Sequence, residues 1–165
     1  MKMMEWLRSH PFWRMRRRIA LWRATSLKKP FKRMVDGLEL STAEIGELGE
    51  LLAVKFLRKH GRKPLSRNFA RAEGGEVDVV ARHGETLTFV EVKTRTKLGV
   101  HRPIDAVTRD KQHLIIRGAR AWLQLLHDPR VPYRFDVVEV ILIEGEAPQM
   151  NVVENAFQVE IERRR

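Results

Sequence analysis

The chain has 165 residues, enough for one domain with additional length, and its apolar fraction of 43% is sufficient for a buried core. It contains no cysteine, which excludes disulfides and thiolate metal sites and leaves Asp, Glu, His and carbonyl oxygen as metal ligands. No apolar run is long enough to cross a bilayer, and arginines interrupt the start of the chain where a secretory signal needs an apolar stretch, so we expect a cytoplasmic protein.

The formal net charge of +11 is concentrated at the start of the chain. Residues 1–33 contain eleven Lys and Arg residues and one acidic residue, so this segment carries +10 and the remainder +1. Such a segment attracts polyanions through counterion release, and an anionic lipid surface would also suit it, although we favour nucleic acid over a membrane. The residues that we expect to contact nucleic acid here are Arg14, Arg16, Arg17 and Arg18. We therefore divide the chain into a basic, Trp-containing extension, 1–38, and a domain, 39–165.

Aromatic residues of the extension, Trp22 and Phe31 among them, can stack on bases, lie at a membrane interface or pack on the domain. The pattern predicts an amphipathic helix over about 12–25. Ser41 or Thr42 can cap a second helix, whose apolar positions repeat at helical spacing over 42–59. A polar link to Phe69 is expected after it.

Two short strands should follow, 77–81 and 86–94, with a turn at Gly84. The next helix begins at Asp105 or Thr108 and runs to about His127. Its candidates for burial are Val107, Ile115, Ala119, Trp122, Leu123 and Leu126. A strand over 135–143 and a final strand over 156–161 complete the order, which predicts a mixed α/β layer fold.

The two strands before this helix contain three charged residues of interest. Side chains alternate along a strand, so Glu91 and Lys93 share a face, and Asp78 on the paired strand can converge with Glu91. Two converging carboxylates repel each other, and a divalent cation relieves that repulsion. Such an ion can activate water for phosphodiester hydrolysis, with the lysine orienting the water or neutralising developing charge. The alternative is an exposed Glu91–Lys93 pair at a sheet edge, with Asp78 in a turn.

Asp78 followed by Glu91-Val92-Lys93 resembles the Asp…Glu-x-Lys signature of the PD-(D/E)XK, or restriction-endonuclease-like, superfamily. This signature alone is weakly specific, but a longer ordered set over roughly 43–140 is similar to the YraN family and is strongly specific. The set comprises Gly49-Glu50, Ala53, Phe56-Leu57, Gly61, Asn68, Gly75 to Val80, Phe89 to Arg95, Gly99, Pro103, Ala106-Val107, Lys111 and Arg134 to Val138.

The resemblance implies a restriction-endonuclease-like fold, with a central mixed sheet flanked by helices, and a likeness to archaeal Holliday-junction resolvases. It implies that Asp78, Glu91 and the carbonyl of Val92 ligate Mg²⁺ or Mn²⁺. By the same resemblance, Lys93 acts on the water, and Glu50 joins the catalytic residues from the first helix of the domain.

These observations favour a nucleic-acid-binding protein that acts as a metal-dependent endonuclease on DNA, branched DNA included. Arg95 and Lys111 are candidates for phosphate contact. Because junction resolvases must cut two strands, a homodimer is the assembly that the analogy suggests. Two alternatives stay open: a non-catalytic nucleic-acid-binding module that retains the nuclease fold, and a membrane-surface protein that uses its basic N-terminus.

Overall fold

The computed structural model describes residues 11–72, 74–97, 107–126, 128 and 130–159, with the backbone alone for residues 11–14. The elements follow in the order α2 (Pro11–Ala24), β1 (Met34–Val35), β2 (Leu38–Glu39), α3 (Thr42–Lys59), β3 (Arg62–Ala70), β4 (Glu76–His83), β5 (Thr86–Arg95), α4 (Arg109–Leu126), β6 (Tyr133–Ile141) and β7 (Gln149–Phe157).

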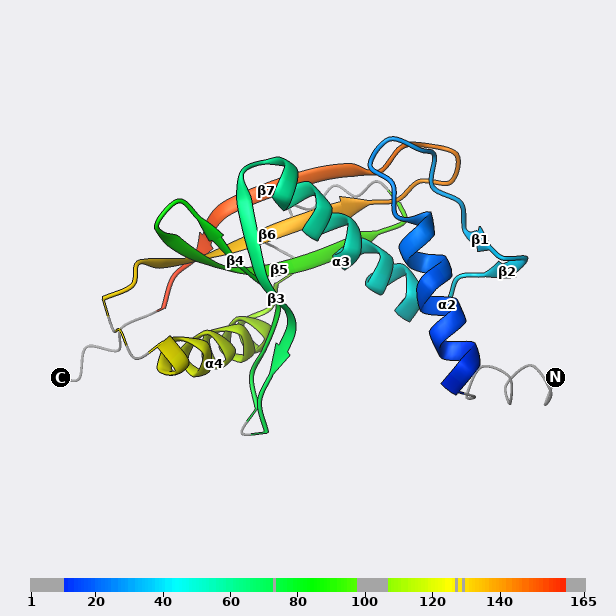
Figure 1. The fold of residues 1–165 in the computed structure, drawn as a ribbon. Helices are drawn as coiled ribbons and strands as arrows, with labels where there is room; N and C mark the ends of the chain where they lie inside the picture. The colour runs from blue at the N-terminus through cyan, green and yellow to red at the C-terminus, as the bar shows by residue number, and fades with distance from the viewer. Residues whose placement is uncertain (1–10, 73, 98–106, 127, 129, 160–165) are drawn as a thin grey trace.

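Five strands form one twisted sheet in the order β3-β4-β5-β6-β7 (Figure 1). Strands β5 and β6 are parallel and are connected through α4, whereas the other neighbouring pairs in this sheet are antiparallel. Helices α3 and α4 lie on opposite faces, because Val90 packs in the cluster that contains Leu52 of α3, and Phe89 packs in the cluster that contains Ile115 of α4. The predicted fold class, a mixed sheet flanked by helices, is confirmed.

Helix α3 begins at a capping box. Ser41 accepts a hydrogen bond from the backbone N–H of Glu44, and the Glu44 carboxylate accepts one from the backbone N–H of Ser41. Two amides that the helix leaves unpaired are thereby satisfied. After α3 the backbone enters the left-handed region at Gly61, where glycine carries little strain. The predicted range of this helix is confirmed.

Helix α4 begins at Arg109, and the hydroxyl of Thr108 accepts a hydrogen bond from the amide of Lys111, so Thr108 caps it. The alternative start, Asp105, and the predicted end, His127, lie outside the described residues. Of the predicted core side chains, the buried or partly buried ones are Val107, Ile115, Ala119, Trp122 and Leu123. The prediction for Leu126, which is exposed, was wrong because helical periodicity marks a face but not where the underlying sheet ends.

The central strands lie close to their predicted ranges, and the Gly84 turn is confirmed, but both edge strands were misjudged. The predicted polar link before Phe69 is strand β3, which pairs with β4 along its length. The final strand is β7, seven residues earlier than the predicted start at Ala156, and residues 160 and 161 lie outside the described part. Both are edge strands with many exposed polar positions, so the alternation of apolar side chains is weak.

The described part of the N-terminal extension packs on the domain. Helix α2 matches the predicted helix within one residue, and its Leu21 joins Phe31 in the core cluster on the α3 face. Arg17 forms an ion pair of 2.6 Å with Glu44 and donates to backbone carbonyls of the β1–β2 segment. Trp22, in contrast, leaves 61% of its surface exposed.

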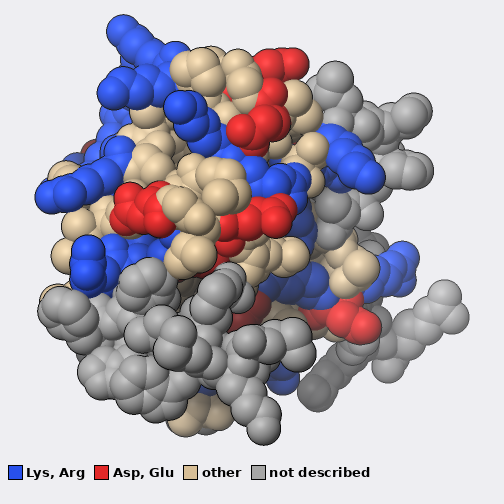
Figure 2. Space-filling model, turned by 90° about the vertical axis from the view of Figure 1, so that its right-hand side faces the viewer, with Lys and Arg blue, Asp and Glu red and all other residues tan. Residues whose placement is uncertain are grey.

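Figure 2 looks at the side of the molecule on which α2 lies. Lys and Arg side chains are spread over this face, with groups of Asp and Glu side chains between them. None of the helices among the described residues is long and apolar enough to cross a membrane.

Candidate active site

Two carboxylates meet where β4 and β5 separate. Pairing between these strands ends at Val79 and Val90, and Asp78 lies one residue beyond it. Asp78 Oδ2 accepts a hydrogen bond of 2.7 Å from the backbone N–H of Val92. The side chain of Glu91 lies close enough for its charge to act directly on Asp78. The structure therefore brings together the two carboxylates that the strand pattern predicts to converge.

The carboxylate pair is enclosed by the protein. Glu91 has 2% of its surface exposed, and Asp78 belongs to β4, so the alternative of an exposed edge pair with a turn aspartate is wrong. Burial, followed by the charge of Glu91, raises the pKa of Asp78 to about 7. Because both carboxylates cannot be ionised here without compensation, the pair binds a proton or a cation near neutral pH.

Two ammonium groups flank Glu91. Lys93 Nζ, in β5, lies 2.8 Å from Oε1 of Glu91, and Lys111 Nζ, in the first turn of α4, lies 3.5 Å from Oε2. Lys111 also forms an ion pair with Glu76. Burial alone would lower the pKa of Lys111, but the hydrogen bond to Glu76 and the charges of Glu91 and Asp78 raise it. Lys111 therefore faces the carboxylates as a cation.

Glu50 approaches these strands from α3. Burial, followed by the charge of Asp78, raises the pKa of Glu50, although a hydrogen bond to Asn68 and the charge of Arg67 oppose that shift. Asn68 lies in β3 with a φ of +53°, in the left-handed region that asparagine tolerates better than most residues. Sequence reasoning did not anticipate this contact, and an asparagine inside a strand was the available signal.

Two glycines allow the helices to approach the site strands closely. A Cβ on Gly49 would lie 1.9 Å from Oγ1 of Thr94, so α3 reaches β5 at a depth that an alanine would prevent. A Cβ on Gly118 of α4 would lie 2.9 Å from a methyl group of Val77 in β4. Because Glu50 follows Gly49, the first of these contacts also places Glu50.

The two predicted phosphate contacts of the domain are each paired with carboxylates. Arg95 Nε lies 2.8 Å from Glu139, and Lys111 is bonded to Glu76. Either side chain would have to release a carboxylate to bind a phosphate.

The predicted arginines of the extension differ from one another. Arg17 is largely enclosed by its contacts with Glu44 and the backbone. Arg18 is exposed and lies 3.5 Å from an acidic residue of α3, Glu47. Arg16 is also exposed, and the side chain of Arg14 lies outside the described residues. None of the described three touches the carboxylate pair.

Comparison with known proteins identifies the family. Residues 49–140, more than half of the chain, match the model of a family described as Uncharacterised protein family UPF0102. The chain belongs to the UPF0102 family. The membership of the YraN family inferred from the motifs is thereby confirmed, since this is the same family. The carboxylate pair and both lysines lie inside the matched region, whereas α2 and β1–β2 precede it.

The UPF0102 protein of Geobacter metallireducens is 43% identical over 122 residues, which cover 74% of this chain and 98% of that protein. The UPF0102 protein of Caldicellulosiruptor saccharolyticus is 43% identical over 119 residues, covering 72% of this chain and 100% of that protein. Among solved structures, Hjc of Archaeoglobus fulgidus, a Holliday junction resolvase, aligns with a TM-score of 0.40 and 18% identity, over 64% of this chain and 75% of that chain.

The donor atoms of this UPF0102 site fit a hard divalent cation. Oε2 of Glu91 and Oε2 of Glu50 are buried without a hydrogen-bond partner among the described residues, although the ammonium of Lys111 lies 3.5 Å from Oε2 of Glu91 as an ion-pair partner. Buried polar atoms are normally paired, and carboxylate oxygens are what Mg²⁺ and Mn²⁺ prefer. No group of three His, Asp or Glu side chains with metal-binding geometry occurs among the described residues, so backbone carbonyl or water oxygens would complete the coordination.

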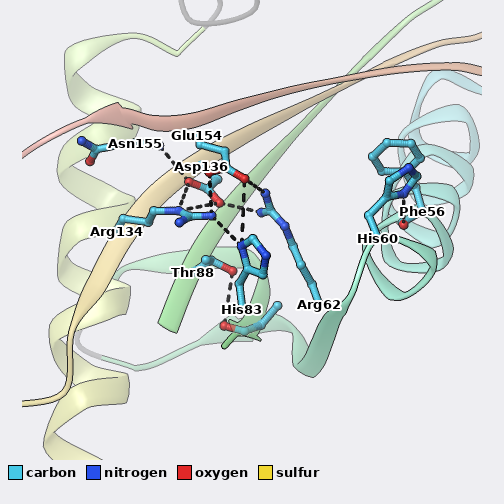
Figure 3. Close-up of polar contacts among 10 residues, drawn as sticks. Phe56, His60, Arg62, His83, Thr88, Arg134, Asp136, Glu154 and Asn155 are labelled. Carbon is cyan, nitrogen blue, oxygen red and sulfur yellow. Dashed lines mark hydrogen bonds and ion pairs between the residues drawn. The ribbon is translucent and has the colours of Figure 1, made fainter. Parts of the chain in front are cut away.

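A second buried charge cluster, on the α3 face of the sheet, was not predicted (Figure 3). Arg62 of β3 and Arg134 of β6 both bond the carboxylate of Asp136, at 2.6 and 2.9 Å, and both reach Glu154 of β7. An aspartate inside an apolar strand also identified Asp78, so the signal was present in the sequence. Each of these arginines bonds two carboxylates, Arg134 also bonds His83 at 3.0 Å, and the cluster joins the edge strands to β6.

Proposed function

We propose that this chain is a divalent-metal-dependent endonuclease that hydrolyses phosphodiester bonds in DNA, branched DNA included. The observation that carries the proposal is the close pair of a partly buried Asp78 and a buried Glu91, whose charge helps to raise the pKa of Asp78, with Lys93 2.8 Å from Glu91. Two carboxylates that repel each other, beside a fixed ammonium, combine a cation site with a group that stabilises negative charge.

Asp78 and Glu91 would hold Mg²⁺ or Mn²⁺ together with the backbone carbonyl of Val92. The N–H of Val92 points to Asp78, and the N–H and C=O of one strand residue face the same side, so this carbonyl faces the separated part of β4 as well. When bound, the ion would polarise a phosphoryl oxygen and lower the pKa of a water molecule.

The remaining roles fall to groups that already surround the pair. In hydrolysis, the water oxygen bonds to phosphorus, one P–O ester bond breaks, and the leaving oxygen takes up a proton. Lys93 would orient the water and stabilise the charge that grows on the phosphoryl oxygens. The pKa of Glu50 is raised by burial and by Asp78, which suits a carboxylate that accepts the proton of the water.

The proposal is tested by incubating the purified chain with labelled junction, flap, duplex and single-stranded DNA and with RNA, in Mg²⁺, Mn²⁺ or EDTA. We expect metal-dependent cleavage of at least one DNA substrate. Asp78→Asn and Glu91→Gln should abolish it while DNA binding stays intact or becomes tighter, because repulsion of phosphate falls. Lys93→Ala should retain metal binding and lose on the order of 10²-fold in rate.

The matched control is Asp128→Asn, purified in the same way, which changes a carboxylate next to Arg130, on the loop between α4 and β6. It should cleave like the wild type. Activity that survives at wild-type level in Glu91→Gln would indicate a contaminating nuclease. A wild-type chain that binds DNA but neither binds these metals by calorimetry nor cuts any substrate would be a non-catalytic binding module.

A further inference from the structure

A groove runs along the outer side of α3, between α2 and β3, and we call it the Trp22 groove. It consists of two adjoining hollows of about 550 and 300 Å³ that share Trp22, Leu51 and Arg67. The first hollow lies towards Arg18 of α2, and the second lies towards Arg58 of α3. Helix α2 precedes the part of the chain that matches the family, so the groove joins a family helix to an added segment.

The groove combines an exposed aromatic ring with positive charge. Trp22 leaves 61% of its surface exposed, and the ammonium of Lys55 lies 5.7 Å from the centre of its ring. The charged side chains that line the groove are Arg18, Lys55, Arg58 and Arg67 against one acidic residue, Glu47. A flat ring among cations is the arrangement in which proteins stack an unpaired base and hold its phosphates.

Arg67 links the groove to the active site. It lines both hollows, and its charge also lowers the pKa of Glu50 against the larger effect of burial. The Nη1 atom of Arg67 is buried and has no hydrogen-bond acceptor among the described residues. Glu47, one turn before Glu50 on α3, lines the groove from the other side. A nucleic-acid strand bound in the Trp22 groove would thus pass near Glu50, a carboxylate of the candidate site.

We propose that the Trp22 groove binds a single-stranded arm of a DNA substrate, with one base stacked on Trp22 and phosphates along Arg18, Arg58 and Arg67. The inference rests on the proposed function for its substrate class, but it concerns binding rather than cleavage. A paired helix hides the faces of its bases, so an exposed indole favours an unpaired segment. A recess between α2, α3 and β3 can accommodate a single DNA strand, whereas a lipid surface is broad and would not enter it. Met15 and Ile19 on the rim of the recess are nevertheless apolar.

The experiment measures binding in EDTA, by anisotropy of a labelled flap DNA and of the same duplex without its single-stranded arm. Trp22→Ala should weaken binding of the flap on the order of tenfold and leave the duplex nearly unchanged. Trp22→Phe should retain most of the affinity, because a phenyl ring still stacks. Arg58→Ala should weaken binding of the flap, reduce the slope of its log affinity against log salt by about one phosphate contact, and leave the duplex nearly unchanged.

Two control variants isolate the groove. Arg130→Ala removes an exposed arginine from the loop between α4 and β6, and it should bind the flap like the wild type. Trp122→Phe changes a ring that packs on Phe69, away from the groove. The chain has four tryptophans, so fluorescence is measured in a background that carries Trp6→Phe and Trp13→Phe. In that background, quenching by the single-stranded arm should persist in Trp122→Phe and be largely lost in Trp22→Phe.

Flap affinity equal to the wild type in folded Trp22→Ala, or unchanged quenching in Trp22→Phe, would overturn the inference. So would a fluorescence change of Trp22 with phosphatidylserine vesicles that the flap does not produce, since the occupant would then be a membrane. Because binding is measured in EDTA, it does not depend on cleavage. A chain that cuts no substrate in Mg²⁺ or Mn²⁺ would therefore count against the proposed nuclease without affecting these binding results. Conversely, if the chain cleaves DNA but fails these binding tests, the proposed nuclease function would stand and the proposed role of the Trp22 groove would be wrong.

Discussion

At the scale of residues, the site depends on electrostatic repulsion between two carboxylates. Asp78 and Glu91 are close enough for each charge to act on the other, and Asp78 accepts a hydrogen bond from the amide of Val92. Lys93 and Lys111 offset part of the negative charge, yet the pKa of Asp78 remains raised to about 7. Compensation of the two carboxylates by the lysines is thus incomplete, and this is the basis on which we propose a divalent cation at the pair.

The raised pKa of Asp78 predicts how the stability of the protein changes with pH when metal is absent. The folded pKa of Asp78 lies above its usual value of 3.8, so the folded state holds more protons than the unfolded state between about pH 4 and pH 7. The contribution of Asp78 to the free energy of unfolding is therefore fully present below about pH 4 and is lost as the pH rises through 7. Asp78→Asn, which can still accept the Val92 amide, should gain stability relative to the wild type as the pH rises.

Urea unfolding in EDTA at pH 5 and pH 7.5 measures this difference, with Asp128→Asn as the control for loss of an acidic residue. Mg²⁺ should then stabilise the wild type at pH 7.5 and have little effect on Asp78→Asn, because binding to the folded state alone adds to stability. A difference between wild type and Asp78→Asn that is the same at both pH values would show that Asp78 has no raised pKa.

At the scale of elements, the geometry of the site depends on how closely the helices pack against the sheet. Gly49 lets α3 approach β5, and Gly118 lets α4 approach β4. The same helix α3 therefore supplies core packing through Leu52 and the carboxylate of Glu50. The two functions are connected by the position of one glycine, since any side chain at Gly49 would displace α3 or Thr94.

Paired alanine substitutions on α3 test this packing. Gly49→Ala should lower the free energy of unfolding by about 1–3 kcal/mol, because the new methyl group overlaps Thr94. Gly46→Ala, on the same helix with no atom within 4 Å of its new Cβ, should raise that free energy by about 0.5–1 kcal/mol. Chemical denaturation measures both, and a Gly49→Ala variant as stable as Gly46→Ala would contradict the close approach.

At the scale of the whole molecule, the extension has two separable properties. It contains most of the net positive charge, and its described part contributes Leu21 and Phe31 to the core on the α3 face. Composition indicated the first property. The second depends on α2 lying against α3, where Arg17 and Glu44 form their ion pair.

Deleting residues 1–33 should therefore weaken DNA binding, flatten its salt dependence and also lower thermal stability, because charge and core side chains are lost together. Leu21→Ala separates the two effects. It should lower the free energy of unfolding by about 2–5 kcal/mol while the salt slope of DNA binding remains that of the wild type. A deletion variant with unchanged stability would show that α2 contributes no net packing energy.

The sequence by itself determined the elements with strong periodicity and the residues of the carboxylate site. Helix α3, the β4–β5 turn and the convergence of Asp78 with Glu91 follow from local patterns, because side-chain direction repeats along a helix or strand. The family followed from the order of motifs over roughly 43–140, and the family model matches residues 49–140.

Only the tertiary structure decided the edge strands, the placement of α2, and the effects of Asn68 and of the Arg67 charge on Glu50. Strands β3 and β7 are stabilised by backbone pairing with their neighbours. Apolar and polar side chains alternate only weakly along both strands, so the sequence pattern gave little indication of them. The Trp22 groove arises where α2, α3 and β3 meet, and residues far apart in the sequence acquire that shared surface through long-range packing, which no local pattern encodes.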